Sequence, residues 1–123
     1  MVIRHMSAPA TVLVIDDSAV ITMTARAILA RAGHHVLLAG TRAEGLATAR
    51  EHTPDVVLLD AVLPDADETQ AEETVRALRE AGAGRVLMCS GLDASELPAA
   101  DGRVAKPFAA DSLLAAVAGV RTG

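Results

Sequence analysis

Five short apolar runs recur along the chain and predict the strands of one sheet. The third run places four apolar residues between Asp55 and Asp60, and the first run is rich in β-branched residues. Continuous apolar runs of this length are typical of strands buried on both faces, which belong to parallel sheets with helices on either side. The predicted strands are Thr11–Ile15, His35–Ala39, Pro54–Asp60, Arg85–Cys89 and Gly102–Ala105.

Between these runs, apolar residues recur at the spacing of helices. Ser18 and Thr41 are candidate N-caps, Glu44 completes a capping box with Thr41, and Gly33 is expected to end the first helix. The first predicted helix follows Ser18, and its inner face holds Val20, Ile21, Ala25, Ile28 and Leu29. The second covers residues 41–52, the third covers Glu68–Glu80, and the fourth is a short turn in Asp93–Leu97 before Pro98. The last helix is capped by Asp111, and one of its faces holds Leu113, Leu114, Val117 and Val120.

The alternation of strands and helices predicts an α/β fold with a five-stranded parallel sheet and right-handed crossovers. Residues 91–105 must hold both the fourth helix and the fifth strand, so the fourth helix is expected to be short. We expect residues 1–10 to form a disordered or tag-like extension and residues 11–121 to form the folded domain.

Polar residues lie just beyond the ends of four predicted strands: Asp16 and Asp17, Asp60, Ser90, and Lys106. Because the carboxyl ends of parallel strands share one edge, these side chains are expected to converge. Neighbouring carboxylates favour a bound cation such as Mg²⁺, and a lysine with a hydroxyl suits a phosphoryl group in transfer. An acidic pair after a strand is more often a helix cap, so the prediction depends on the joint placement.

The composition of the chain argues against several classes of function and location. A net charge of −5 disfavours direct binding to nucleic acid, which depends on basic residues. The single cysteine, Cys89, excludes an internal disulfide and indicates a reducing, cytoplasmic compartment. We interpret Cys89 as a small buried residue and Met23 as a helix packing residue. No apolar run approaches the length of a membrane helix.

The chain closely resembles the receiver domain of two-component response regulators over about Thr11 to Val120. The resemblance implies the doubly wound, flavodoxin/CheY-like three-layer sandwich. It is carried by Val14–Ser18, Pro54–Asp60 with Leu63-Pro64 after it, Met88–Gly91, and Lys106–Phe108.

The resemblance also implies a metal site for Mg²⁺ or Mn²⁺. Asp17 matches the direct ligand, Asp16 matches the residue that holds the metal largely through water, and the backbone carbonyl of Val62 matches the third protein ligand. Asp60, the residue that matches the phosphoacceptor, completes this set.

For phosphotransfer, Ser90 matches the switch hydroxyl and Lys106 the phosphate-binding lysine, with a cis bond expected before Pro107. The implied function is a phosphorelay receiver that accepts a phosphoryl group on Asp60 and switches conformation. The donor would be a histidine kinase, a histidine phosphotransfer protein or acetyl phosphate. Such a domain assists its own phosphorylation and dephosphorylation but is not classed as an enzyme.

The chain departs from the family pattern in three places. Its fourth helix is short, Asp67-Glu68 replaces the usual loop glycine, and Arg103 occupies the position of the aromatic switch residue. A homodimer through the last strand and helix is implied by the resemblance. Because the charge of an arginine resists burial, we predict that the chain does not signal by the usual aromatic-coupled dimerisation. The shortened region also resembles the receivers attached to hybrid sensor kinases.

Two further hypotheses follow from particular residues. Val62 and Leu92 flank the path of the attacking water in this family and are apolar here, which predicts a long-lived aspartyl phosphate. The alternatives to a receiver are a phosphatase of the haloacid dehalogenase type and a degenerate receiver that binds partners without phosphorylation. Val62, where that phosphatase needs a second aspartate, argues against the first, and the intact polar set argues against the second.

Overall fold

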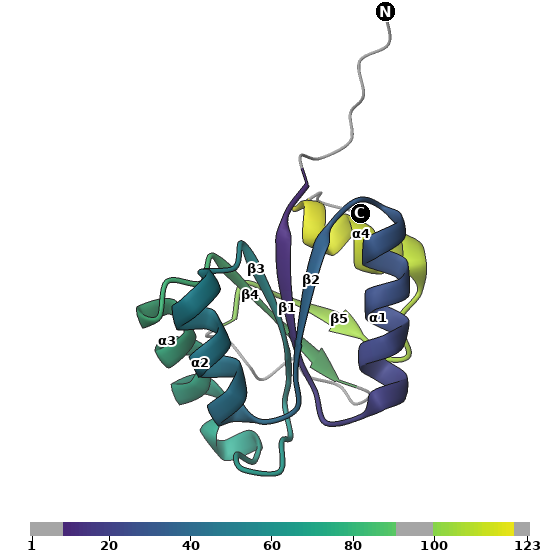
Figure 1. The fold of residues 1–123 in the computed structure, drawn as a ribbon. Coiled ribbons are helices and arrows are strands. Elements are labelled where there is room, and N and C mark those ends of the chain that lie inside the picture. Colours follow the sequence, from purple (N-terminus) through teal and green to yellow (C-terminus); the bar gives the residue numbers. More distant parts are fainter. Residues whose placement is uncertain (1–8, 91–99, 120–123) are drawn as a thin grey trace, which may run out of the picture.

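The structure is a computed structural model that describes residues 9–90 and 100–119, apart from the side chains of Glu68 and Ser90. Within these residues, five parallel strands form one sheet in the order β2-β1-β3-β4-β5 (Figure 1). The predicted parallel sheet is therefore confirmed. The strands are β1 (Thr11–Ile15), β2 (His35–Ala39), β3 (Val56–Asp60), β4 (Arg85–Ser90) and β5 (Gly102–Ala105).

Helices cover both faces of the sheet, which confirms the predicted three-layer sandwich. One face carries α2 (Arg42–His52) and α3 (Ala71–Glu80), and the other carries α1 (Ala19–Arg31) and α4 (Ala110–Ala118) (Figure 1). A 3₁₀ turn, η1 (Glu68–Gln70), precedes α3. The short helix predicted in residues 93–97 lies outside the described residues. No helix in the described ranges has both the length and the hydropathy needed to cross a bilayer.

Alternation along β1 divides the core between the two faces. Leu13 and Ile15 pack in the layer of α2 and α3, whereas Val12 and Val14 pack in the layer of α1 and α4. Such alternation follows from the two-residue period of a strand. It leaves the central strands apolar on both faces and brings polar residues to the surface where those strands end.

The N-cap residues of α1 and α2 are those predicted, but Glu44 Oε1 accepts the Gly40 N–H (2.7 Å) rather than the Thr41 N–H that a capping box uses. Thr41 Oγ1 accepts a hydrogen bond from the Glu44 backbone N–H (3.0 Å), and Ser18 Oγ accepts one from the Ile21 N–H (3.4 Å). Gly33, with φ +95°, follows the end of α1. A left-handed conformation favours glycine at this position.

Several helix predictions were wrong. Val20 and Met23 were assigned to packing but are 74% and 66% exposed. Buried Thr22 lies on the inward face instead, and its hydroxyl donates a hydrogen bond to the Ala19 carbonyl (3.2 Å). Asp111 does not cap α4, since the N-cap position belongs to Ala109. The helix predicted from Glu68 begins as the 3₁₀ turn and becomes α-helical only at Ala71.

Candidate functional site

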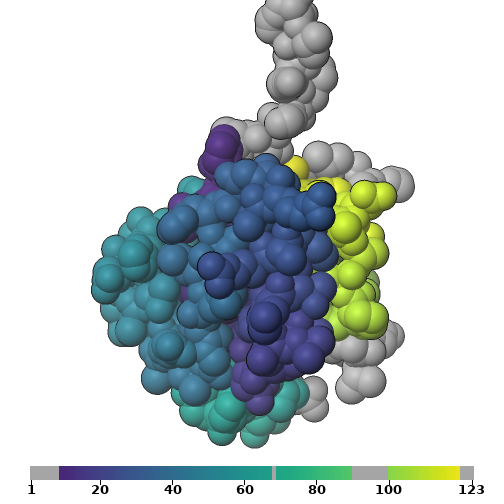
Figure 2. All heavy atoms as spheres, turned by 45° about the vertical axis from the view of Figure 1, so that its right-hand side comes forward, coloured from purple at the N-terminus to yellow at the C-terminus, as the bar shows by residue number. Residues whose placement is uncertain are grey.

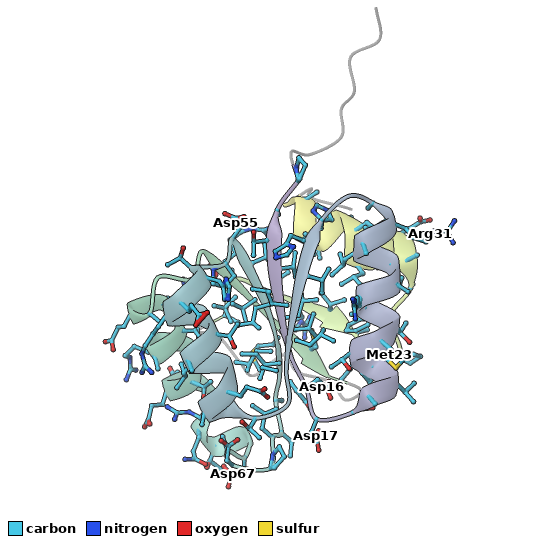
Figure 3. All side chains as sticks on the ribbon, viewed as in Figure 1. Asp16, Asp17, Met23, Arg31, Asp55 and Asp67 are labelled. Carbon is cyan, nitrogen blue, oxygen red and sulfur yellow. The ribbon has the colours of Figure 1, made fainter. Side chains whose placement is uncertain are left out.

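Three carboxylates meet at the carboxyl edge of the sheet. β1 and β3 are neighbouring strands in which Ile15 lies opposite Leu59. The residues that follow these two, Asp16 and Asp60, therefore lie at the same level along the edge of the sheet. One carboxylate oxygen from each of Asp16, Asp17 and Asp60 lies within 4.8 Å of the others. Figure 3 shows Asp16 and Asp17 where β1 leads into α1, at the end of the sheet opposite Asp55. The structure thus brings together the acidic residues that the sequence predicted to converge.

Lys106 supplies the cation of this group. It follows β5 at the edge of the sheet, and its Nζ lies 2.8 Å from Asp16 Oδ2 and 3.3 Å from Asp60 Oδ1. The Lys106 side chain is only 15% exposed, and that of Asp16 only 3%. A buried ion pair holds its geometry because each charge would be costly to leave alone. The bond before Pro107 is cis, as the resemblance implied.

Buried Asp16 and half-buried Asp60 have different surroundings. Asp16 uses both oxygens, since Oδ1 accepts the Ser18 N–H (2.9 Å) and Oδ2 accepts Lys106. Asp60 accepts the Val62 N–H (3.3 Å) and contacts Lys106, and both contacts are made by Oδ1. Asp17 is exposed beside them. Asp16 is therefore fixed by the protein on both sides, while Asp17 faces solvent.

Burial sets the ionisation of the site. Desolvation raises the pKa of Asp60, and the charge of Asp16 adds to the rise, while the Val62 N–H and the charge of Lys106 oppose it. For Lys106, burial disfavours the charged form, but the hydrogen bond to Asp16 and the charges of Asp60 and Asp16 outweigh it and raise its pKa. Lys106 is therefore a permanent cation at neutral pH, and Asp60 is more basic than an ordinary aspartate.

The donor set fits a hard divalent cation. Three carboxylates against one lysine leave an excess of negative charge within a few ångströms. Oxygen ligands with open positions toward solvent suit Mg²⁺, which keeps part of its water shell, and Mn²⁺ accepts the same ligands. Exposed Asp17 and half-buried Asp60 offer such oxygens, whereas Asp16 is engaged by Ser18 and Lys106.

The remaining predicted residues are placed by their backbones. Ser90 ends β4 and pairs with Ala105, the residue before Lys106. Cys89 lies opposite Asp60, so Ser90 is one residue beyond that level. The side chain of Ser90 and all of Leu92 lie outside the described residues. Val62 follows β3, bonds to Asp60 through its N–H, and is 54% exposed.

Cys89 is buried, as interpreted from the sequence, and its pKa is raised to about 12, first by desolvation. It is therefore a neutral thiol at physiological pH. Arg103 lies on β5 with an exposed side chain, opposite Met88.

Sequence reasoning missed Asp65. Its carboxylate accepts the backbone N–H groups of Arg42 (2.7 Å) and Ala43 (3.0 Å) at the start of α2. Asp65 lies in a loop next to Pro64 and close to Asp67, and it shows no pattern that separates it from other turn residues. The only signal would have been the need of α2 for acceptors at its first N–H groups.

Comparison with known proteins points to one family. The chain matches the response regulator receiver domain over residues 12–118. It is 32% identical over 114 residues to the chemotaxis protein CheY of Bacillus subtilis, covering 86% of this chain and 92% of that protein. The transcriptional regulatory protein KdpE of Mycobacterium tuberculosis is 37% identical over 109 residues, which cover 85% of this chain and 47% of that protein. The structure of the chemotaxis response regulator CheY4 of Vibrio cholerae superposes with a TM-score of 0.79 at 28% identity, covering 93% of this chain and 100% of that one.

Proposed function

The chain belongs to the response regulator receiver domain family of two-component signalling, and from that premise we propose that Asp60 is its phosphoacceptor. Receiver domains are signalling modules rather than classical enzymes. The observation that carries the proposal is the contact of Lys106 with both Asp16 and Asp60, beside three carboxylates that lie within 4.8 Å of one another.

In the proposed step, a carboxylate oxygen of Asp60 attacks the phosphorus of the donor. A P–O bond to Asp60 forms as the P–N bond of a phosphohistidine breaks, and the electron pair of that bond returns to the imidazole, which leaves neutral if its other nitrogen carries a proton. With acetyl phosphate, a P–O bond breaks and acetate leaves. Because Oδ1 already bonds to Val62 and contacts Lys106, Oδ2 is the oxygen that we assign to the attack.

Lys106 has two tasks in this proposal. Before transfer it holds Asp60 Oδ1 at 3.3 Å, so the carboxylate is oriented. When a phosphoryl group arrives, the same ammonium faces its oxygens and stabilises their charge. Asp16 keeps Lys106 in place through the 2.8 Å contact. Ser90, at the end of the neighbouring strand, is proposed as the hydroxyl that bonds a phosphoryl oxygen and moves with it.

A divalent cation would be held by Asp17, Asp60 and the backbone carbonyl of Val62, and by Asp16 largely through water, because both Asp16 oxygens already accept hydrogen bonds from the protein. Mg²⁺ or Mn²⁺ supplies positive charge that draws donor phosphate and carboxylate together and offsets charge in the transition state. Burial raises the pKa of Asp60, and the protein alone leaves this carboxylate close to that of Asp16. We therefore expect phosphorylation to require the metal.

The partner that delivers the phosphoryl group is proposed to be a histidine kinase or a histidine phosphotransfer protein in the cytoplasm. The exposed large apolar residues of the described ranges are Val20, Met23 and Val62. Val20 lies three positions after Asp17, and Val62 two positions after Asp60. Figure 3 shows Met23 on the outer side of α1, and Figure 2 shows α1 and α4 forming one continuous surface. Exposed apolar side chains on α1 and after β3, on elements that also carry the charged site, would suit a helical partner that presents a phosphohistidine.

Intact-mass spectrometry tests the proposal directly. The protein is incubated with acetyl phosphate and Mg²⁺, beside the Asp60→Asn variant and a sample with chelator. We expect a single phosphoryl adduct that requires both Asp60 and the metal. If the protein binds Mg²⁺ but gains no adduct from acetyl phosphate or from a phosphohistidine donor, the function is phosphorylation-independent binding instead.

A further inference from the structure

The N-terminus of α2 is held by a residue from the loop that follows the phosphoacceptor strand. Asp65 Oδ1 accepts the Arg42 N–H (2.7 Å), and Oδ2 accepts the Ala43 N–H (3.0 Å). Thr41 Oγ1 accepts the next N–H, that of Glu44 (3.0 Å). The first N–H groups of a helix have no acceptor within the helix. Asp65 therefore supplies the two acceptors that the local cap does not.

The side chain of Arg42 extends this connection to α3. Its Nε donates to Thr74 Oγ1 (2.9 Å), and its Nη2 lies 3.6 Å from Glu73 Oε1. Thr74 is buried, and its hydroxyl donates to the Gln70 carbonyl (3.0 Å). The start of α2 is thus bonded both to the loop and to the helix that follows the loop, so it acts as an anchor for the loop between them.

The loop itself is closed by two backbone bonds around Asp65. The Leu63 N–H donates to the Ala66 carbonyl (2.8 Å), and the Ala66 N–H donates to the Leu63 carbonyl (3.2 Å). The Leu63 N–H belongs to the same peptide unit as the Val62 carbonyl. Because a trans peptide is planar and its N–H and C=O point in opposite directions, fixing the Leu63 N–H fixes the direction of the Val62 carbonyl.

We propose that Asp65 is a positioning residue: by bonding to the first two N–H groups of α2, it holds the turn that sets the direction of the Val62 carbonyl. This proposal rests on the proposed function where it names that carbonyl as a metal ligand. Asp65 is not among the residues proposed to contact the metal or the phosphoryl group. It acts from three residues away through the Leu63–Ala66 turn.

The ionisation of Asp65 agrees with this arrangement. The hydrogen bonds from Arg42 and Ala43 lower the pKa of the Asp65 carboxyl. The residue is therefore charged at neutral pH, and its bonds to the helix are charge-assisted, which makes them stronger than neutral ones.

The first test compares Asp65→Ala with Glu72→Gln, which removes one negative charge from the exposed surface of α3. Amide hydrogen exchange is followed by NMR without metal, and Mg²⁺ binding is measured by calorimetry. In Asp65→Ala we expect the Leu63 and Ala66 amides to exchange about tenfold faster, as for a lost charge-assisted bond. We expect Mg²⁺ to bind about tenfold more weakly, as for residues that orient a metal ligand. Glu72→Gln should change neither.

The second test removes the donor instead of the acceptor. Arg42 is the first residue of α2, a position that accepts proline, and Thr41 before it is extended (φ −138°, ψ 164°), as a residue before proline prefers. Arg42→Pro deletes both the N–H and the side chain, whereas Arg42→Ala deletes only the side chain. The difference between the two variants should reproduce part of the Asp65→Ala effect and should vanish when Asp65 is already Ala.

A third readout separates positioning from general loss of structure. At low Mg²⁺, Asp65→Ala should be phosphorylated by acetyl phosphate more slowly than the wild type, and saturating Mg²⁺ should restore the rate. The proposal is overturned if the turn amides and the Mg²⁺ affinity of Asp65→Ala match the wild type, or if saturating Mg²⁺ leaves the rate low. If the wild type itself binds no Mg²⁺, the proposed function fails, while the metal-free exchange data still decide whether Asp65 holds the turn.

Discussion

The ammonium nitrogen of Lys106 lies 2.8 Å from Asp16 Oδ2, although the two residues are 90 positions apart in the sequence. The contact joins the end of edge strand β5 to the end of β1, so Lys106 reaches past the ends of β4 and β3. On the way it passes Asp60 at 3.3 Å. The ammonium group of one residue at the edge of the sheet thus partly neutralises two carboxylates at its centre. It reduces the repulsion between these carboxylates when no metal is bound.

Replacing Lys106 by Met keeps an unbranched side chain but removes this charge. Because the ammonium and a divalent cation compete for Asp16 and Asp60, we expect Mg²⁺ to bind about tenfold more tightly in Lys106→Met. Phosphorylation of Asp60 should nevertheless become slower, since the charge facing the phosphoryl oxygens is lost. Calorimetry and intact-mass kinetics measure the two effects separately.

Arg76→Met is the matched control, because it removes one positive charge from an exposed position of α3. It should leave both quantities unchanged. A Lys106→Met variant that binds Mg²⁺ more weakly than the wild type would show that Lys106 supports the metal site rather than competing with it.

The raised pKa of Asp60 predicts how stability depends on pH. Its causes are desolvation first and then the charge of Asp16, opposed by Val62 and Lys106. A carboxyl with a raised pKa in the folded state binds protons more readily there than in the unfolded chain, so its contribution favours folding at low pH and is lost as pH rises through the folded pKa. Without metal, Asp60→Asn should therefore increase the free energy of unfolding at neutral pH, and the gain should shrink in acid. Urea unfolding at several pH values measures it.

Asp67→Asn provides the opposite case. The side-chain hydroxyl and backbone N–H of Thr69 lower the pKa of Asp67, so its carboxylate favours folding above its unfolded pKa, and this contribution is lost in acid. This substitution should lower stability at neutral pH. If both variants shift stability in the same direction, the ionisation of Asp60 does not govern its effect.

The sequence predicted the sheet well because its strands are unambiguous. Four of the five strands have the predicted bounds to within one residue at each end, since apolar runs such as Val12–Ile15 end at polar residues. The convergence of Asp16, Asp17 and Asp60 followed from this, because parallel strands present their carboxyl ends on one edge. The predictions of which residues face inward on a helix were less accurate than the predictions of the strands. Val20 and Met23 are apolar but exposed, as the inward face of α1 is built on Thr22, Ala25 and Leu29.

Contacts between loops and distant helices were beyond sequence reasoning. Asp65 accepts hydrogen bonds from backbone N–H groups that are 23 and 22 residues away. Because these partners are backbone groups, the side chains of the residues that carry them do not reveal the contact. Arg85 likewise donates to the Ala116 carbonyl (3.0 Å) and to the Val117 carbonyl at the end of α4. Every residue supplies a backbone carbonyl and every residue except proline a backbone N–H, so residue types carry little information about such pairs.

The surface beside Asp60 predicts a long-lived phosphoryl group. Val62 is 54% exposed two positions after Asp60, and its apolar side chain cannot orient an attacking water by hydrogen bonding. Val62→Asn offers such a bond, and a bond of about 1 kcal/mol corresponds to about a fivefold faster loss of the label. Intact-mass decay after removal of the donor measures the rate. Val20→Asn, at a valine on α1 that is 74% exposed, is the control and should leave the decay unchanged. If both variants decay like the wild type, Val62 does not limit hydrolysis.

Arg103 predicts how the chain responds to phosphorylation. It lies on β5, three positions before Lys106, with its side chain exposed. An aromatic residue can move between buried and exposed positions at low cost, whereas a guanidinium resists burial. With beryllofluoride and Mg²⁺ as a phosphoryl mimic, we therefore expect the oligomeric state to be that of the unmodified chain in sedimentation experiments. Arg103→Tyr restores an aromatic side chain at this position and is the matched variant. A stable dimer of the wild type through β5 and α4, formed only with the mimic, would show that dimerisation here does not need the aromatic residue.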